Sequence, residues 1–212
     1  MKRLNERSRN VTEGVARAPN RSMYYAMGYE EKDFVKPMVG VANGHSTITP
    51  CNSGLQKLAD AAVIALEEAG AKAQMFGTPT VSDGIGMGTE GMKYSLVSRE
   101  VIADSIEVCV NGLWQDGVLV IGGCDKTVPA QLMGAASADV PAIQLVTGPM
   151  MTGRHEGERL GACTDCRRFW GSYRAGKIER KTIDIVEGRL ATTAGTCAVM
   201  GTASTMACIA ET

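Results

Sequence analysis

Three consecutive side chains of different chemistry, Cys124, Asp125 and Lys126, follow a strongly apolar run of the chain. That run, residues 117–121, is typical of a strand covered on both faces in a parallel sheet, and two glycines then free the turn of side-chain crowding. A thiolate binds soft metals, whereas a carboxylate and a modified or neutral lysine suit a hard cation. The alternative interpretation is a tight turn with a solvated Asp–Lys pair and a buried thiol.

Two further cysteines have a similar setting. Cys51 lies just ahead of an apolar helical pattern, where the positive end of the helix dipole favours a thiolate. Cys197 follows a loop of small residues and precedes another apolar run. Thiols from three separate loops, those of Cys51, Cys124 and Cys197, are able to converge on one cluster. Because the regular spacing of zinc ribbons does not join them, packing roles stay open.

An acidic residue, Asp83, is followed by glycines at positions 84, 86 and 88. This pattern suits a carboxylate ligand held on tightly folded backbone, and it equally suits a turn closed by an Asx hydrogen bond. The spacing differs from that of Walker and Rossmann phosphate loops, so the segment does not predict nucleotide binding.

Cys163 and Cys166 form a C-x-x-C pair, which is a spacing used by zinc and redox sites. The pair lies in a charged, loop-rich segment without a second pair, so we assign it no metal or redox role. The remaining thiols and imidazoles receive other roles: Cys109 and Cys208 as small core residues, and His45 and His155 as surface or site-lining loop residues.

Strand-like runs alternate with helix-like ones along the chain. We predict strands at residues 37–42, 73–76, 117–121 and 142–146, separated by helices at about 52–69, 97–109 and 129–139. This alternation predicts an α/β fold with a doubly wound, mostly parallel sheet and helices on both faces. Ligands of such sheets bind at the carboxyl ends of the strands, which is where Cys51, Asp83 and Cys124 fall.

Two parts of the chain carry weaker patterns. Residues 1–36 predict an irregular N-terminal arm packed on an α/β domain of residues 37–212. Within that domain, residues 147–181 are charged and predict loops with one helix around 167–173. A final helix is expected to begin near Cys197 and to continue to the last residue.

The composition excludes several classes of function. The 212 residues include 23 acidic and 22 basic ones, and this net charge of −1 provides no global field for nucleic acid or an anionic membrane. No run approaches the roughly 20 apolar residues that a membrane span needs. Seven cysteines, an odd number, and an N-terminus without an apolar signal core predict a reducing, cytoplasmic location.

Several motifs, in order, resemble the dihydroxy-acid dehydratases, a family that includes the 6-phosphogluconate and sugar-acid dehydratases. The resemblance runs from about Arg7 to the last residue. The motifs that carry it are Lys36-Pro37 through Pro50-Cys51-Asn52, Val81-Ser82-Asp83-Gly84-Ile85, Gly91-Met92-Lys93-Tyr94-Ser95-Leu96, Arg99-Glu100-Val101-Ile102-Ala103-Asp104-Ser105 and Gly123-Cys124-Asp125-Lys126.

The resemblance implies an iron–sulfur, Mg²⁺-dependent hydro-lyase. Cys51, Cys124 and Cys197 would hold a [2Fe–2S] or [4Fe–4S] cluster, since three cysteines fit either type. The Mg²⁺ ligands would be Asp83, Asp125 and a carbamylated Lys126. The implied reaction converts 2,3-dihydroxy-3-methyl carboxylates to 2-keto acids in valine and isoleucine biosynthesis, and the implied assembly is a homodimer.

The length departs from the family, whose members are several hundred residues long and draw their catalytic base from a later part of the chain. Residues 207–212 lie in an apparent helix without a cap. We therefore expect a chain truncated before the C-terminal domain and inactive by itself, and we assign no catalytic base. Two alternatives remain: a sugar-acid dehydratase of the same superfamily, or a non-catalytic α/β metal-binding fragment.

Overall fold

A single parallel sheet forms the centre of the protein, whose computed structural model describes residues 3–197 and 200–212. Its strands are β1 (Met38–Asn43), β2 (Lys72–Gly77), β3 (Gly117–Gly122) and β4 (Ala142–Val146). They lie in the order β2-β1-β3-β4, and every neighbouring pair is parallel. All four were predicted from the sequence to within two residues at either end.

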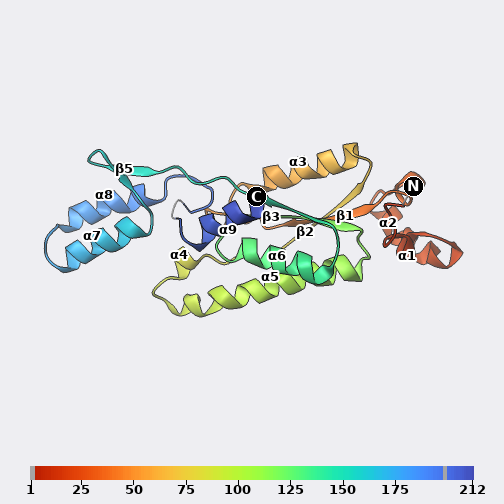
Figure 1. The fold of residues 1–212 in the computed structure, drawn as a ribbon, viewed down its shortest axis with the longest axis horizontal. Helices are drawn as coiled ribbons and strands as arrows, with labels where there is room; N and C mark the ends of the chain where they lie inside the picture. The colour runs from red at the N-terminus through yellow and green to blue at the C-terminus, as the bar shows by residue number, and fades with distance from the viewer. Residues whose placement is uncertain (1–2, 198–199) are drawn as a thin grey trace.

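Helices cover both faces of the sheet (Figure 1). Helix α3 (Leu55–Glu68) lies on one face, and α5 (Lys93–Gly112) and α6 (Thr127–Ala138) lie on the other. The predicted doubly wound α/β fold is confirmed. Helix α3 begins after the predicted position because Gly54 has a φ of +93° and ends a turn there, and Gly70, with a φ of +88°, stops the helix as expected.

Successive strand residues point to opposite faces and so build two cores. The core beneath α3 contains Val41, Leu55, Ala59 and Ile121, and the core beneath α5 and α6 contains Ala42, Ile102, Ile106, Val110, Val118, Val120, Ala130, Ala135 and Ala138. Strand β3 contributes to both, which explains why its sequence is apolar throughout.

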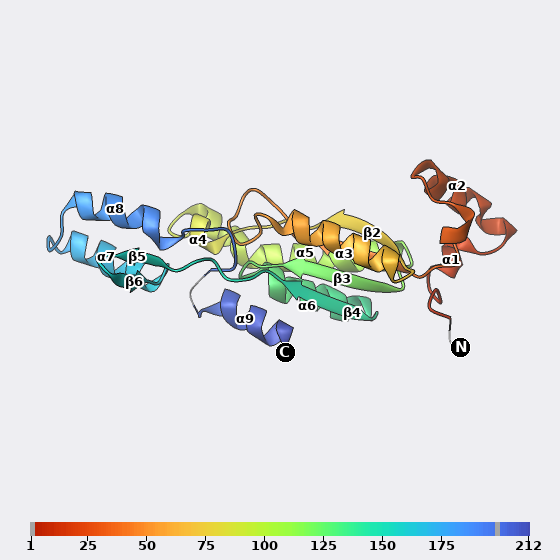
Figure 2. The same cartoon turned by 90° about the horizontal axis from the view of Figure 1, so that it is seen from above.

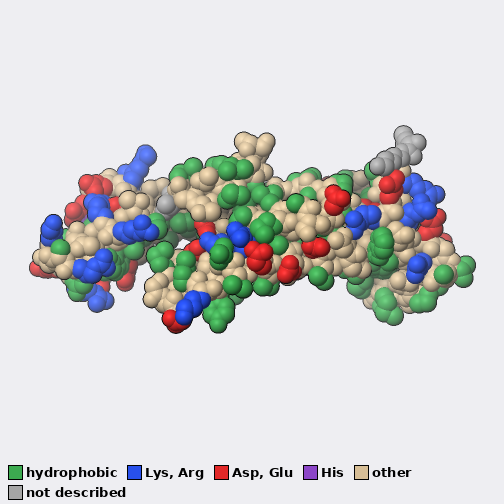
Figure 3. Space-filling model, turned by 60° about the horizontal axis from the view of Figure 1, so that its bottom comes forward, with side chains coloured by type: hydrophobic (Ala, Val, Ile, Leu, Met, Phe, Trp, Pro, Cys, Tyr) green, Lys and Arg blue, Asp and Glu red, His purple; other side chains and the backbone are tan. Residues whose placement is uncertain are grey.

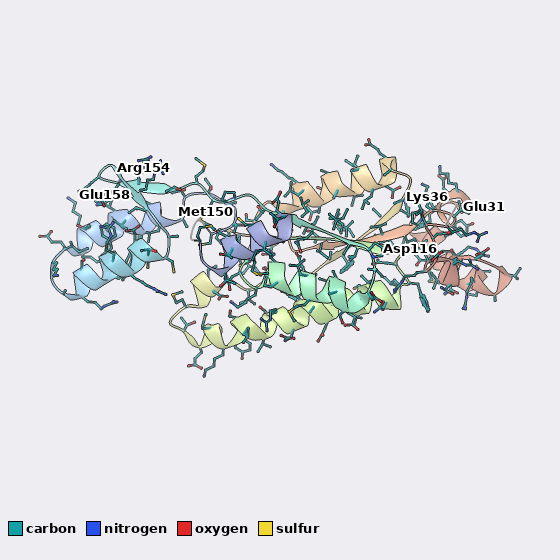
Figure 4. All side chains as sticks on the ribbon, viewed as in Figure 1. Glu31, Lys36, Asp116, Met150, Arg154 and Glu158 are labelled. Carbon is teal, nitrogen blue, oxygen red and sulfur yellow. The ribbon has the colours of Figure 1, made fainter. Side chains whose placement is uncertain are left out.

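The N-terminal arm is more regular than predicted. It contains α1 (Arg9–Thr12), η1 (Val15–Arg17), α2 (Ala18–Ala26) and η2 (Glu31–Asp33). Pro19 lies in the first turn of α2, where the missing N–H of proline costs no helical hydrogen bond. Asp116, labelled in Figure 4, ties the arm to the sheet. Its Oδ1 atom accepts the backbone N–H groups of Arg7 at 2.7 Å and Ser8 at 3.1 Å.

The segment predicted to be mostly loop, residues 147–181, is also more ordered. A hairpin of β5 (Gly153–His155) and β6 (Glu158–Leu160) turns through Glu156 and Gly157, both at positive φ. It is followed by α7 (Thr164–Arg174) and by α8 (Arg180–Leu190), which was not predicted. Helix α9 (Thr202–Glu211) begins at Thr202, not near Cys197 as predicted.

The molecule is elongated, with the arm at one end and the hairpin, α7 and α8 at the other (Figure 2). On the face shown in Figure 3, Lys and Arg side chains gather at both ends and are interspersed with acidic ones. None of the helices within the described residues combines the length and apolar character that a bilayer-spanning segment needs.

Candidate functional site

Two cysteines lie at the point of the sheet where the strand order switches from one side of β1 to the other. Strands β1 and β3 are neighbours, although β2 stands between them in the sequence. A crevice at the carboxyl ends of such a pair is the usual ligand position in doubly wound sheets. Cys51 lies in the loop after β1 and Cys124 in the loop after β3, and their side chains are 6% and 2% exposed.

The thiols of Cys51 and Cys124 contact each other. A hydrogen bond from Cys124 lowers the pKa of Cys51 to about 7, with a further contribution from the backbone of Cys197. The same bond, together with burial, raises the pKa of Cys124. The thiol of Cys51 therefore ionises more readily than that of Cys124, and the main chain of Cys197 lies within hydrogen-bonding reach of Cys51.

The loop before Cys197 is joined to both of the other cysteine loops. The N–H of Gly195 donates to the carbonyl of Pro50 at 2.9 Å, and the hydroxyl of Thr196 donates to the carbonyl of Gly123 at 3.1 Å. Gly195 has a φ of +132°, and a Cβ atom there would lie 2.7 Å from the backbone nitrogen of Met150, so a residue without a side chain is required. Three loops distant in sequence thus meet at one edge of the sheet.

A second cluster consists of charged side chains and begins at Asp125, directly after Cys124. The Nζ atom of Lys126 lies 2.7 Å from Oδ2 of Asp83 and is also ion-paired with Asp125. The other oxygen of Asp83, Oδ1, accepts the hydroxyl of Ser95 at 2.5 Å. The three charged side chains are 17–20% exposed, so they form a half-buried group.

The electrostatics of this cluster favour the charged forms of Asp83 and Lys126. Burial alone would raise the pKa of Asp83, but hydrogen bonds from Lys126 and Ser95 outweigh it and hold that pKa below the usual value. Burial likewise opposes the charge on Lys126, yet bonds to Asp125 and Asp83 raise its pKa. The Asp83 carboxylate and the Lys126 ammonium therefore lie side by side, and the side chain of Asp125 is the second partner of Lys126.

The donor set fits a hard cation only if the lysine changes. An ammonium ion offers no lone pair, and it lies between the carboxylates where a divalent cation would be attracted. Conversion of Lys126 to a carbamate would replace that positive charge by anionic oxygen donors. Within residues 3–197 and 200–212, no three His, Cys, Asp or Glu side chains surround one point closely enough to hold a single metal ion. The proposed cation ligands differ from such a group because one of them is a lysine. The three cysteines differ from it because they would surround a cluster of several atoms and not a single ion.

Comparison with known proteins identifies the family. The family model described as "Dihydroxy-acid/6-phosphogluconate dehydratase N-terminal" matches residues 36–212. The chain belongs to this family. It is 69% identical over 206 residues to a dihydroxy-acid dehydratase of Polynucleobacter asymbioticus. The aligned residues make up 97% of this chain and 36% of that relative. It is 61% identical over 209 residues to dihydroxy-acid dehydratase 3 of Aromatoleum aromaticum, covering 99% of this chain and 37% of the relative. The chain thus spans just over a third of the length of these relatives.

The other cysteines of this dehydratase-family chain lie on separate elements. Cys163 and Cys166 are at the start of α7, in the lobe with the hairpin, and Cys109 is half-buried on α5. Cys208, predicted as a core residue, is exposed on α9, so that prediction is wrong. Helix α9 buries Ala203 and Ala207, and Cys208 lies on another face of this helix.

The two histidines have local roles in the described structure. The Nδ1 atom of His45 lies 3.2 Å from the carbonyl oxygen of Asn52, within the Cys51 loop, so His45 does line the site. His155 is packed edge-on against Phe169, with ring centroids 5.6 Å apart, in the lobe formed by the hairpin and α7.

Sequence reasoning missed residues that support the side chains of this candidate site. Asn52, fully buried, donates from Nδ2 to the carbonyl of Gly44 at 2.5 Å and folds the Cys51 loop back on the end of β1. Ser95 and Thr196 were also not singled out. Each lies in or beside a motif already noted, but nothing in a short polar side chain indicates which distant backbone or carboxylate it will bind.

Proposed function

We propose that this chain is the cluster- and cation-binding part of a dehydratase that converts 2,3-dihydroxy-3-methyl carboxylates to 2-keto acids, the reaction that leads to valine and isoleucine. The observation that carries the proposal is the meeting of the Cys51, Cys124 and Cys197 loops beside the group of Asp83, Asp125 and Lys126. Relatives named dihydroxy-acid dehydratase, with 59–69% identity, support it.

The three cysteines would hold an iron–sulfur cluster, either [2Fe–2S] or [4Fe–4S]. When bound through three thiolates, such a cluster supplies an iron with an open coordination position that can act as a Lewis acid. The chain prepares for this by lowering the pKa of Cys51 and by burying Cys51 and Cys124 away from water. A reducing, cytoplasmic location, which is part of the proposal, keeps these thiols available.

Asp83, Asp125 and a carbamylated Lys126 would hold Mg²⁺. Before any modification, the ammonium of Lys126 offsets the repulsion between the two carboxylates and keeps them side by side. Ser95 fixes one oxygen of Asp83 and leaves the other directed at Lys126. The cation-binding oxygens are thus preorganised by Asp83, the first residue of α4 (Asp83–Gly86), by the loop after β3 and by Ser95 on α5.

The carboxylate cluster and the cysteine cluster suit the two adjacent carbons of the substrate that react, C2 and C3. Dehydration of a 2,3-dihydroxy acid removes a proton from C2 and the hydroxyl group from C3, and both changes develop negative charge that must be stabilised. The substrate's carboxylate and C2 hydroxyl are oxygen donors of the kind that a Mg²⁺ ion held by Asp83 and Asp125 would bind. Its C3 hydroxyl would then face the cysteine side, since Cys124 and Asp125 are adjacent. No base is assigned to this chain.

A chimera tests the reaction. This chain replaces the matched 206 residues of the Polynucleobacter asymbioticus relative, and keto-acid formation is measured from 2,3-dihydroxy-3-methylbutanoate and from 6-phosphogluconate, with Mg²⁺ and under anaerobic conditions. We expect turnover of the first substrate. Turnover of 6-phosphogluconate alone would favour the sugar-acid alternative, which the description of the family includes. An inactive chimera beside an active relative would support a non-catalytic metal-binding module.

Cluster binding is tested separately, without turnover. The chain is reconstituted anaerobically with ferrous iron and sulfide, and both are quantified together with the visible spectrum. Substitution of Cys51, Cys124 or Cys197 by serine should abolish stable loading with iron and sulfide. Cys163→Ser, at the N-cap of α7, should leave the loading unchanged. Equal iron content in all four variants would contradict the assignment of the ligands.

A further inference from the structure

We propose that Thr196 is a positioning residue that sets the Cys197 loop against the Cys124 loop, so that the thiols can hold one iron–sulfur cluster together. The inference rests on the proposed function. Thr196 stands immediately before Cys197, and its partner Gly123 stands immediately before Cys124. Their link therefore joins the two residues that directly precede the cysteines.

The hydroxyl of Thr196 makes this link in the interior. The residue is 2% exposed, and its Oγ1 atom lies 3.1 Å from the carbonyl oxygen of Gly123 and 3.2 Å from that of Thr147. One hydroxyl proton is thus shared between the ends of β3 and β4. The contact connects residues 73 positions apart, at the edge of the sheet where the cysteine loops meet.

The backbone of Thr196 is held independently of its side chain. Its N–H donates to the carbonyl of Gly148, and its own carbonyl accepts the N–H of Met150, both at 2.9 Å. Met150 lies between the sheet and the hairpin lobe (Figure 4). Because these two bonds do not involve the hydroxyl, a substitution that removes only the hydroxyl leaves the loop anchored and affects its register against Gly123.

The neighbouring contacts serve other parts of the fold. Gly195 binds Pro50, which concerns the Cys51 loop, and the hydroxyl of Ser204 on α9 donates to the carbonyl of Cys197 at 2.6 Å. The first contact sets the Cys197 loop against the Cys51 loop, and the second sets it against the following helix. The bond from the Thr196 hydroxyl to Gly123 differs from both, because it reaches the Cys124 loop.

The test compares Thr196→Val, which removes the hydroxyl at nearly constant volume, with Thr196→Ser, which retains it. Iron and sulfide are quantified after anaerobic reconstitution, and the rate of iron loss to a chelator is followed by the visible spectrum. We expect Thr196→Val to lose iron at least about tenfold faster than wild type, the scale on which residues supporting metal ligands act. Thr196→Ser should restore the wild-type rate.

A matched control comes from the same loop. The hydroxyl of Thr193 accepts the N–H of Met151 at 2.8 Å and is exposed, so Thr193→Val removes a hydrogen bond of this loop that does not reach a cysteine loop. It should lose iron at the wild-type rate. Circular dichroism and thermal unfolding of the metal-free proteins show whether each variant is folded, and Thr196→Ala replaces Thr196→Val if the latter does not fold.

The outcomes are distinguishable. If the wild-type chain takes up no iron and sulfide, the proposed function is overturned and this inference with it. If wild type is loaded and Thr196→Val loses iron at the same rate, only the inference is overturned. Unfolding of both Thr196→Val and Thr196→Ala would also overturn it, since the threonine would then serve the fold and not the register of the cysteines.

Discussion

The ammonium of Lys126 lies 2.7 Å from the Oδ2 atom of Asp83, although 43 residues separate the two in sequence. The carboxylate belongs to the first residue of α4, which follows β2, and the amine comes from the loop after β3. Strand β1 lies between β2 and β3 in the sheet. This ion pair is what holds the proposed cation-binding oxygens together in the unmodified chain.

Asp83→Asn should weaken Mg²⁺ binding by more than about tenfold, because the amide keeps the shape of the carboxylate but loses the charge that a hard cation requires. Isothermal titration of the protein with Mg²⁺ in bicarbonate buffer measures the affinity. Asp184→Asn, at an exposed position of α8, is the control and should change nothing. An unaltered affinity in Asp83→Asn would remove this residue from the cation site.

Ser95→Ala should have a smaller effect on the same titration, about tenfold or less in Mg²⁺ affinity. The substitution releases one oxygen of Asp83 without removing any charge, so the carboxylate can rotate away from the position that a cation needs. Ser105→Ala is the matched control on the same helix, since Ser105 donates to the carbonyl of Val101 within α5. Equal affinities for the two variants would argue against an orienting role of Ser95.

Gly123→Ala should destabilise the fold by about 1–3 kcal/mol, the usual cost of overpacking. A Cβ atom at this position would overlap Cγ2 of Thr147 and lie 2.5 Å from the carbonyl oxygen of Cys51, so the loops after β1 and β3 would have to separate. Urea unfolding measures the change. Gly148→Ala, where an added Cβ meets nothing within 4 Å, should be close to neutral, and a neutral Gly123→Ala would show that the loops adapt.

Asp33→Asn should destabilise the protein at neutral pH by about 1 kcal/mol and progressively less below pH 4. Asp33 is buried, and hydrogen bonds from the Lys36 side chain and from the backbone of Glu30 lower its pKa below the ordinary 3.8. A carboxylate whose pKa is lower in the folded state than in the unfolded state makes its full contribution to stability at pH values above the unfolded-state pKa. This contribution is lost as the pH falls through the folded-state pKa.

Chemical unfolding of wild type and Asp33→Asn at pH 7 and at several values between about 4 and 2.5 tests the Asp33 prediction. The difference between the two proteins should shrink over the acidic range. Asp104→Asn, at an exposed position of α5, is the control and should give only a small difference. A constant penalty for Asp33→Asn at all pH values would mean that the lost interaction does not depend on the charge of the carboxylate.

The parts of the structure that sequence predicted best are those with one dominant local signal. Residues 117–121 are apolar at every position, and a segment of that kind is stable only when covered on both sides, so β3 and the loop bearing Cys124 followed directly. The β5–β6 hairpin gave no such signal. Its strands have three residues each and include the charged Arg154, Arg159 and Glu158, so the turn at Glu156 and Gly157 determines it.

The site was predictable as a set of loops, but its internal contacts were not. Parallel strands bring their carboxyl ends to one edge, and this rule alone assigned Cys51, Asp83 and Cys124 to a common region. The bonds of Ser95 to Asp83 and of Thr196 to Gly123 depend on how α5 and the last loop are positioned in space. Side-chain type carries no information on that positioning.

The all-parallel order of the sheet also constrains the time at which the site can form. Parallel neighbours need crossover connections, so β1 and β3 pair only after the intervening helices and β2 have been made, and such long-range pairing is slow compared with helix formation. The contact between Thr196 and Gly123 closes a further loop of 73 residues. During synthesis on the ribosome, the first two cysteine loops can therefore meet well before the third emerges, and until then a cluster of the proposed kind would encounter two of the three thiols.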